Sequence, residues 1–228
     1  MINSDLAVEF ASDIVKKSDQ NRCENIIKRI NVTDKSLFND RCGVYYDIDC
    51  TAEPYIVENA IAECLLSYGY KCDKILLIGL GNARYISDAL GELVLDNLPV
   101  ANEKMAKFKP QVSRVTGIES HDIILSTKKL VKPTLIIAID SLATSDIARV
   151  GKSIQITNVG LTPGSGVGNS RKILTAKSLG VPILAIGVPL VASVNVNNSR
   201  RLVIPIDTED IAEKLAKSIA NGIRQILS

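Results

Sequence analysis

The sequence is poor in histidine, in aromatic side chains and in net charge. His121 is the one histidine among 228 residues, so a His-rich catalytic zinc site is excluded and a Ser-His-Asp triad would need that residue. Aromatic residues make up 4% with no Trp, which argues against the base stacking of single-strand nucleic-acid binders. The 27 Lys and Arg nearly balance the 25 Asp and Glu, so charge alone indicates neither a nucleic-acid nor a membrane partner. Any chemistry must rely on carboxylates, hydroxyls or thiols.

Disulfide and membrane signals are also scarce. An odd number of cysteines without a C-x-x-C pair or a secretory leader favours reduced thiols in a cytosol. The longest apolar run, 181–196, is broken by Gly187 and Pro189 and falls short of a membrane span. We therefore expect a cytoplasmic protein without a membrane partner. The five cysteines all lie in the first third of the chain: Cys23, Cys42, Cys50, Cys64 and Cys72.

Hydrophobic periodicity predicts an α/β fold over a single domain, residues 1–228. Apolar runs such as KILLIGL and TLIIAID are typical of strands covered by helices on both faces. The implied architecture is a three-layer α/β/α sandwich with a mostly parallel sheet. Helices are expected at 5–17, 53–69, 88–98, 120–130, 170–179 and 208–227. Strands are expected at 26–32, 44–48, 74–78, 111–115, 134–139, 153–157, 182–186 and 202–206.

In open α/β sheets, ligands bind beyond the carboxyl ends of the strands, and this rule singles out three loops. The loop 79–92 contains Asp88, the loop after 135–139 begins with Asp140, and the loop 158–172 is rich in glycine. Asp140 directly follows an apolar strand, where an ionisable group must be partly desolvated. A helix cap or a hydrogen-bond anchor is the structural alternative for each aspartate.

Two carboxylates that face one crevice can share a proton, because the pKa of one rises while that of the other falls. One can then act as a base on water while the other acts as an acid. Asp88 and Asp140 are therefore the candidate catalytic pair.

The glycine-rich loop matches no nucleotide-binding pattern. PGSGVGNSRK lacks the GK[ST] ending of a P-loop, and Arg84 stands where a dinucleotide fingerprint in GLGNAR needs its third glycine. Ser165 is outside a G-x-S-x-G elbow, since Pro163 occupies the first glycine position. The loop could instead offer backbone amides to an extended peptide or an oxyanion, or it could be a glycine turn packed over the sheet.

At these same loops the sequence resembles the germination protease family of spore-forming bacteria, the endopeptidases that degrade small acid-soluble spore proteins. The matching segments run in family order over most of the chain, and the long glycine-rich block is the most specific of them. They are SDLAVE (4–9), IGLGN (78–82), SDALG (87–91), TGIES (116–120), IAIDSLA (137–143), IQITNVGLTPGSGVGN (154–169) and LGVPILAIGVPLV (179–191).

The resemblance implies a peptidase that uses two aspartates, which fall on Asp88 and Asp140, with no cofactor and no metal. It also implies a fold similar to that of hydrogenase maturation proteases. A metal-dependent maturation protease is one alternative, in which His121 would supply a ligand, and a non-catalytic peptide-binding paralogue is the other. The residues expected to orient the carboxylates or to hold substrate are Asn82, Gly164, Ser165, Gly166, Gly168, Asn169 and Arg171.

The resemblance further implies small acid-soluble spore proteins as substrate, no direct nucleic-acid contact, a homo-oligomer that is a tetramer in the family, and a place in the cytoplasm of the spore core. The chain departs from the family pattern at Ser87 and Glu92, where the family has proline, and at Ser141 and Ser145. It is expected to be a shortened member, with three residues before SDLAVE where the family carries a longer pro-segment.

Overall fold

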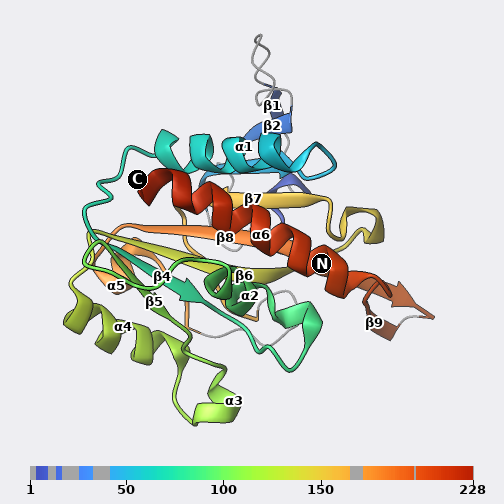
Figure 1. The fold of residues 1–228 in the computed structure, drawn as a ribbon. Helices are drawn as coiled ribbons and strands as arrows, with labels where there is room; N and C mark the ends of the chain where they lie inside the picture. Colours follow the sequence, from blue (N-terminus) through green and yellow to red (C-terminus); the bar gives the residue numbers. More distant parts are fainter. Residues whose placement is uncertain are drawn as a thin grey trace.

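One mixed β-sheet runs through the protein, with helices on both of its faces (Figure 1). The computed structural model describes residues 4–9, 14–16, 26–32, 42–164, 172–197 and 199–227. Within these residues the α/β class and the sandwich architecture expected from the sequence are confirmed.

The sheet has the strand order β1-β2-β3-β7-β8-β6-β4-β5, and β9 pairs with β8 beside this path. The pairs β8–β6, β6–β4 and β4–β5 are parallel, whereas the pairs β1–β2, β2–β3, β3–β7, β7–β8 and β8–β9 are antiparallel. The strands are β1 (Ile14–Lys16), β2 (Ile27–Val32), β3 (Gly43–Asp49), β4 (Ile75–Gly79), β5 (Met105–Phe108), β6 (Leu135–Thr144), β7 (Ser153–Thr157), β8 (Ile183–Val196) and β9 (Ser199–Val203).

The expectation of a mostly parallel sheet is therefore wrong for one half of the sheet. A parallel crossover requires about a dozen or more connecting residues, usually including a helix. Only residues 145–152 join β6 to β7, and only residues 197–198 join β8 to β9. Strands β7 and β9 accordingly run antiparallel to β8. The parallel half, β8-β6-β4-β5, is the half that carries the predicted site.

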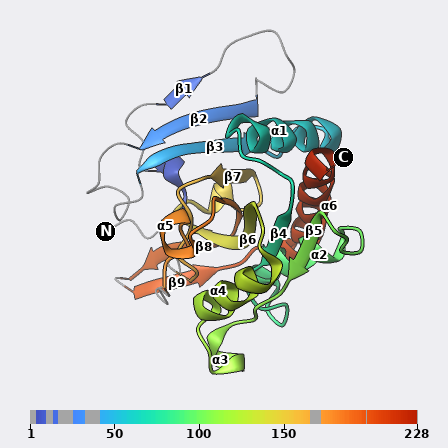
Figure 2. The same cartoon turned by 90° about the vertical axis from the view of Figure 1, so that its left-hand side faces the viewer.

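Two layers of helices cover the sheet. Figure 1 shows α6 lying across one face between α1 and α2, and Figure 2 shows α4 and α5 away from that layer. The helices are α1 (Pro54–Ser67), α2 (Leu90–Asp96), α3 (Ser113–Thr116), α4 (Ser120–Val131), α5 (Ala176–Leu179) and α6 (Thr208–Leu227). Single 3-10 turns form η1 (Ala7–Glu9), η3 (Ile86–Asp88) and η4 (Ile147–Arg149).

Alternate residues of the central strands supply the two cores, because successive side chains of a strand point to opposite faces. Leu77 and Ile137 pack in the cluster with α1, α2 and α6. Ile78 and Ala138 pack in the cluster with Ile124 of α4 on the other face. This burial on both faces explains the uninterrupted apolar runs in the sequence.

Four predicted elements differ in the structure. The strand expected at 202–206 begins earlier, as β9, because Ser199–Val203 pairs with the end of β8 across a two-residue connection. In its described residues, the helix expected at 5–17 is replaced by η1 and β1: Asp5 bonds to Ala143 of β6, Ala7 bonds to Gln155 of β7, and β1 pairs with β2. The strand expected at 111–115 is replaced by β5 and the short α3, since Met105–Phe108 pairs in register with β4. The helix expected at 170–179 contains α5, and residues 170 and 171 lie outside the described residues. Among the described residues, no helix is both long enough and apolar enough to cross a membrane.

Candidate functional site

Asp140 lies in β6, directly past the last pair that this strand forms with β4. That pair joins Gly79 to Ile139, so the carboxyl end of β4 lies beside the aspartate. The residue is 6% exposed. The backbone N–H of Ser141 donates to its Oδ1 at 3.0 Å. The burial agrees with the sequence prediction of a desolvated carboxyl, but the strand does not end there: β6 continues to Thr144 by pairing with β8, so Asp140 lies within it.

Asp88 ends η3, which leads from the β4 loop into α2. The backbone N–H of Asn82 donates to the Asp88 carbonyl at 2.9 Å, which closes the loop. Asn82 is buried, and its Oδ1 accepts from the N–H of Arg84 at 3.0 Å. The structure therefore places Asn82 as the residue that shapes the turn next to Asp88.

Glycines in GLGN and SDALG allow these two segments to touch. A Cβ on Gly81 would lie 2.0 Å from the Asp88 carbonyl oxygen, and the φ of Gly81 is +99°. A Cβ on Gly91 would lie 2.4 Å from the carbonyl oxygen of Leu80 and 2.7 Å from that of Ile139. Only glycine permits such approach without displacing backbone. The glycines thus bring the start of α2 against the ends of β4 and β6, where Asp140 follows.

The two aspartates are coupled electrostatically. Burial raises the pKa of Asp88 to about 6, a backbone N–H bond from Asn82 opposes this rise, and the nearby charge of Glu92 adds to it. Burial also raises the pKa of Asp140 well above its usual range, and the negative charges of Asp88 and Asp5 raise it further. Both carboxyl groups thus have raised pKa values, and two neighbouring carboxyl groups that titrate apart can divide the acid and base roles on water.

Asp5 and Glu92 act on this pair although the sequence did not identify them as site residues. Glu92 accepts from Gln111 Nε2 at 2.9 Å and from the N–H of Ala83 at 3.3 Å. Asp5 falls at the start of the helix expected at 5–17, so its approach to β6 could not be anticipated. The presence of SDLAVE among the segments that carry the resemblance was the available signal for it.

The described residues at the two ends of the glycine-rich loop are joined by backbone hydrogen bonds. Leu161 and Leu174 exchange two backbone hydrogen bonds of 3.0 and 2.8 Å. A Cβ on Gly160 would lie 2.0 Å from the Leu174 carbonyl oxygen, so glycine is needed there. Gly164 is described, with φ +74°. The other predicted substrate-binding positions of this loop lie outside the described residues: Ser165, Gly166, Gly168, Asn169 and Arg171.

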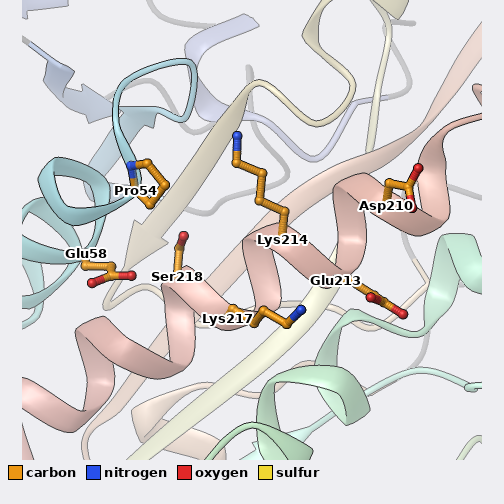
Figure 3. Close-up of a pocket in the computed structure, with 7 residues that line it drawn as sticks. All are labelled: Pro54, Glu58, Asp210, Glu213, Lys214, Lys217 and Ser218. Carbon is orange, nitrogen blue, oxygen red and sulfur yellow. The ribbon is translucent and has the colours of Figure 1, made fainter.

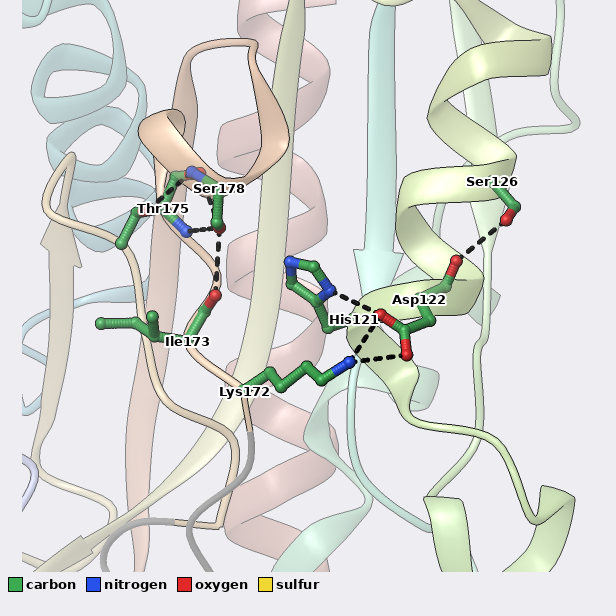
Figure 4. Close-up of polar contacts among 7 residues, drawn as sticks. All are labelled: His121, Asp122, Ser126, Lys172, Ile173, Thr175 and Ser178. Carbon is green, nitrogen blue, oxygen red and sulfur yellow. Dashed lines mark hydrogen bonds and ion pairs between the residues drawn. The ribbon is translucent and has the colours of Figure 1, made fainter.

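His121 takes part in a separate polar cluster at the start of α4 (Figure 4). Its Nδ1 lies 3.0 Å from Asp122 Oδ1, and Lys172 Nζ donates to Asp122 Oδ2 at 2.8 Å. The hydrogen bonds from Lys172 and His121 lower the pKa of Asp122. In the described ranges, no three His, Cys, Asp or Glu side chains are placed to hold one metal ion.

A hollow lies between α1 and α6, and side chains of both charges surround it (Figure 3). These helices cover the face that Ile137 and Ile139 supply, whereas Asp140 shares the opposite face with Ala138. The hollow is therefore separate from the aspartate pair. Its lining residues are Pro54, Glu58, Asp210, Glu213, Lys214, Lys217 and Ser218.

Comparison with known proteins gives one family. The family model described as germination protease matches residues 55–206. A germination protease of Caldanaerobacter subterraneus subsp. tengcongensis is 40% identical over 150 residues, covering 60% of this chain and 46% of the relative. A germination protease of Bacillus cytotoxicus is 42% identical over 130 residues, covering 51% of this chain and 35% of the relative. The matched part thus spans less than half the length of each of these relatives.

Among solved structures, a [NiFe] hydrogenase maturation protease, HycI from Thermococcus kodakarensis, is similar with a TM-score of 0.44 and 21% sequence identity. The similarity covers 67% of this chain and 93% of that chain.

Proposed function

Because the chain belongs to the germination protease family, we propose that it is an endopeptidase that hydrolyses small acid-soluble spore proteins during spore germination. Asp88 and Asp140 activate the attacking water. The observation that supports this proposal most directly is the pair of desolvated carboxyl groups beside the carboxyl end of β4, in which the charge of Asp88 raises the pKa of Asp140. The role is assigned to one peptidase domain over residues 1–228.

The proposed reaction gives each aspartate one task. Asp88, the carboxylate, accepts a proton from water as the water oxygen bonds to the scissile carbonyl carbon. Asp140, the protonated acid, donates its proton to the carbonyl oxygen. When the tetrahedral intermediate collapses, Asp88 passes its proton to the leaving amine, and a hydroxyl of the intermediate returns one to Asp140. The products are a carboxylic acid and an amine, and both side chains regain their starting states.

Substrate contacts are proposed at the two loops beside the pair. Asn82 would orient the Asp88 turn, because its backbone and side chain both bond within that turn. Backbone amides at Gly164, Gly166 and Gly168 would hold an extended peptide or the developing oxyanion. Ser165, Asn169 and Arg171 complete the proposed set through the family resemblance.

The cellular location, the partners and the oligomeric state are also proposed from the family resemblance. We assign the chain to the cytoplasm of the spore core, with spore proteins as partners and without direct nucleic-acid or membrane contact. A homo-oligomer, a tetramer by resemblance, is proposed, and light scattering coupled to gel filtration measures its mass. The reaction is proposed to need no cofactor and no metal.

Mass spectrometry of spore proteins incubated with the full chain tests the function. The wild type, Asp88→Asn and Asp140→Asn are compared, each with and without a chelator. Defined internal fragments from the wild type, unaffected by chelator, are expected, together with loss of cleavage by at least about 10²-fold in each variant. Asp122→Asn is the matched control, since Asp122 lies in the separate His121 cluster and should leave cleavage unchanged.

Two results would contradict the proposal. Loss of wild-type activity with chelator, restored by added metal, would instead indicate a metal-dependent maturation-type protease. Binding of spore proteins without any cleavage would indicate the peptide-binding paralogue.

A further inference from the structure

The segment Ser4–Glu9, called here the N-terminal strap, is fastened to β6 just after Asp140. The N–H of Asp5 donates to the Ala143 carbonyl at 2.9 Å, and Asp5 Oδ2 accepts from the Ala143 N–H at 3.0 Å. One residue of the strap thus satisfies both backbone groups of Ala143. This contact lies where β6 continues past its last pair with β4.

Gln155 of β7 holds the strap from a second side. Its Nε2 donates to the Asp5 carbonyl at 3.1 Å, and its Oε1 accepts from the Ala7 N–H at 2.6 Å. Gln155 is paired with Gly187, which is paired with Asp140, so the three stand in one row across β7, β8 and β6. Because paired residues share a face, the glutamine and the aspartate point to the same side of the sheet.

The strap is also packed and anchored at its far end. Leu6 and Ala7 are fully buried against Ile30 and Tyr45. The Glu9 carboxylate accepts from both hydroxyl groups of Thr144 and Ser145, and from the Ser145 N–H at 3.1 Å. Burial of apolar side chains and hydrogen bonds at both ends fix the position of the strap on the sheet.

The position of the strap matters because it brings the charge of Asp5 close to the Asp140 carboxyl. The groups that act on the Asp140 carboxyl are Asp88 from η3, Asp5 from the strap and the N–H of Ser141 from its own strand. In the described part of the chain no cation is among them. Each nearby carboxylate disfavours ionisation of the Asp140 carboxyl.

We propose that Asp5 is a positioning residue of the aspartate site: it fixes the end of β6 through Ala143 and places a third carboxylate beside the catalytic pair. The matched region of the family, 55–206, does not include it. The inference deepens the proposed function and rests on it for the catalytic consequence. Its structural and electrostatic parts do not depend on whether the chain cleaves anything.

Two substitutions in the full chain separate the positioning of β6 by Asp5 from the effect of its charge. Asp5→Asn keeps a side-chain oxygen that can accept from the Ala143 N–H but removes the charge. Asp5→Ala removes both. Asp47→Asn is the control, because Asp47 is another buried aspartate on the same sheet face, opposite Gln155, that does not act on Asp140.

The first measurement is the titration of the Asp140 and Asp88 carboxyl carbons by NMR with 13C-labelled aspartate. Asp5→Asn should move the Asp140 titration to lower pH by at least half a pH unit, and Asp47→Asn should leave it unchanged. In a cleavage assay, the alkaline limb of kcat/KM should move to lower pH by the same amount, since Asp140 must be protonated. An unchanged Asp140 titration in Asp5→Asn would overturn the electrostatic part.

The second measurement is amide hydrogen exchange at Ala143 and its neighbours. Asp5→Ala should speed exchange at Ala143 by at least tenfold and lower kcat more than it raises KM, while Asp5→Asn retains protection. Wild-type protection in Asp5→Ala would overturn the positioning part. If the wild type cleaves nothing while the titration and exchange respond as expected, the proposed function fails and the assignment of Asp5 stands.

Discussion

The pKa of Asp88 depends on burial, on a backbone hydrogen bond from Asn82 and on the charge of Glu92. Of these, the charge of Glu92 can be removed by a single substitution. Glu92 carries the like charge that raises the pKa of Asp88, while its Oε1 and Oε2 contact Gln111 and Lys109. Replacing the charge with an amide of the same shape removes the repulsion and keeps an acceptor for Gln111.

We therefore expect Glu92→Gln to shift the acid limb of kcat/KM, about pH 6 in the wild type, to lower pH by less than one unit. Asp96→Asn is the matched control: Asp96 is on the same helix and binds the same Lys109 at 2.7 Å, but it does not act on Asp88. The measurement is the pH dependence of peptide cleavage between pH 4 and 9. Equal shifts in both variants would show that the loss of Lys109 pairing, and not the charge of Glu92, controls the limb.

At the residue scale, the sequence alone could single out Asp88 and Asp140 as candidates because the signals that mark them are local. Asp140 follows five apolar residues and Asp88 opens a helix after a glycine turn, so both could be found by reading along the chain. Asp5 could not, because its role depends on Ala143 and Gln155, which lie 138 and 150 residues away. Contacts of that separation follow from the topology of the sheet and leave no periodic signal in the sequence.

Among the elements, helices with strong periodicity and strands covered on both faces were predicted best. The helix expected at 208–227 and the strand expected at 153–157 have the bounds of α6 and β7. The helix expected at 5–17 failed because Leu6, Phe10 and Ile14 have helical spacing, yet the strap obtains its hydrogen bonds from β6 and β7. Tertiary contacts here outweigh a local preference worth only a few tenths of a kcal/mol per residue.

The turn between β4 and α2 depends on Gly81. We expect Gly81→Ala to lower the free energy of unfolding by more than about 2 kcal/mol, because its Cβ would collide with the Asp88 carbonyl and its φ is +99°. Gly69→Ala is the control, since Gly69 has φ +66° but open space around it. Strain alone should cost about 1 kcal/mol there. Urea unfolding followed by circular dichroism gives both values, and similar losses in the two variants would refute the role of the close approach.

At the scale of the whole molecule, the buried Asp47 and Asp140 and the half-buried Asp88 make stability depend on pH in an unusual direction. Burial raises the pKa values of Asp47, Asp88 and Asp140 in the folded state above the usual 3.8. The folded state therefore binds more protons than the unfolded chain at mildly acidic pH, and its stability falls as the pH rises through the folded pKa values. Typical proteins instead gain stability from their aspartates over this range.

We expect the midpoint temperature of thermal unfolding of the wild type to decrease as the pH is raised from 5 to 8. The midpoint temperature of Asp88→Asn should decrease less. For Asp88 the folded pKa is about 6. The charge thus costs up to about 3 kcal/mol above pH 6 at 1.36 kcal/mol per pKa unit, and nothing below pH 4. The variant should match the wild type in urea unfolding at pH 4 and exceed it at pH 8. A gap of equal size at both pH values would mean that Asn changes packing and that the partly desolvated charge of Asp88 is not what destabilises the fold.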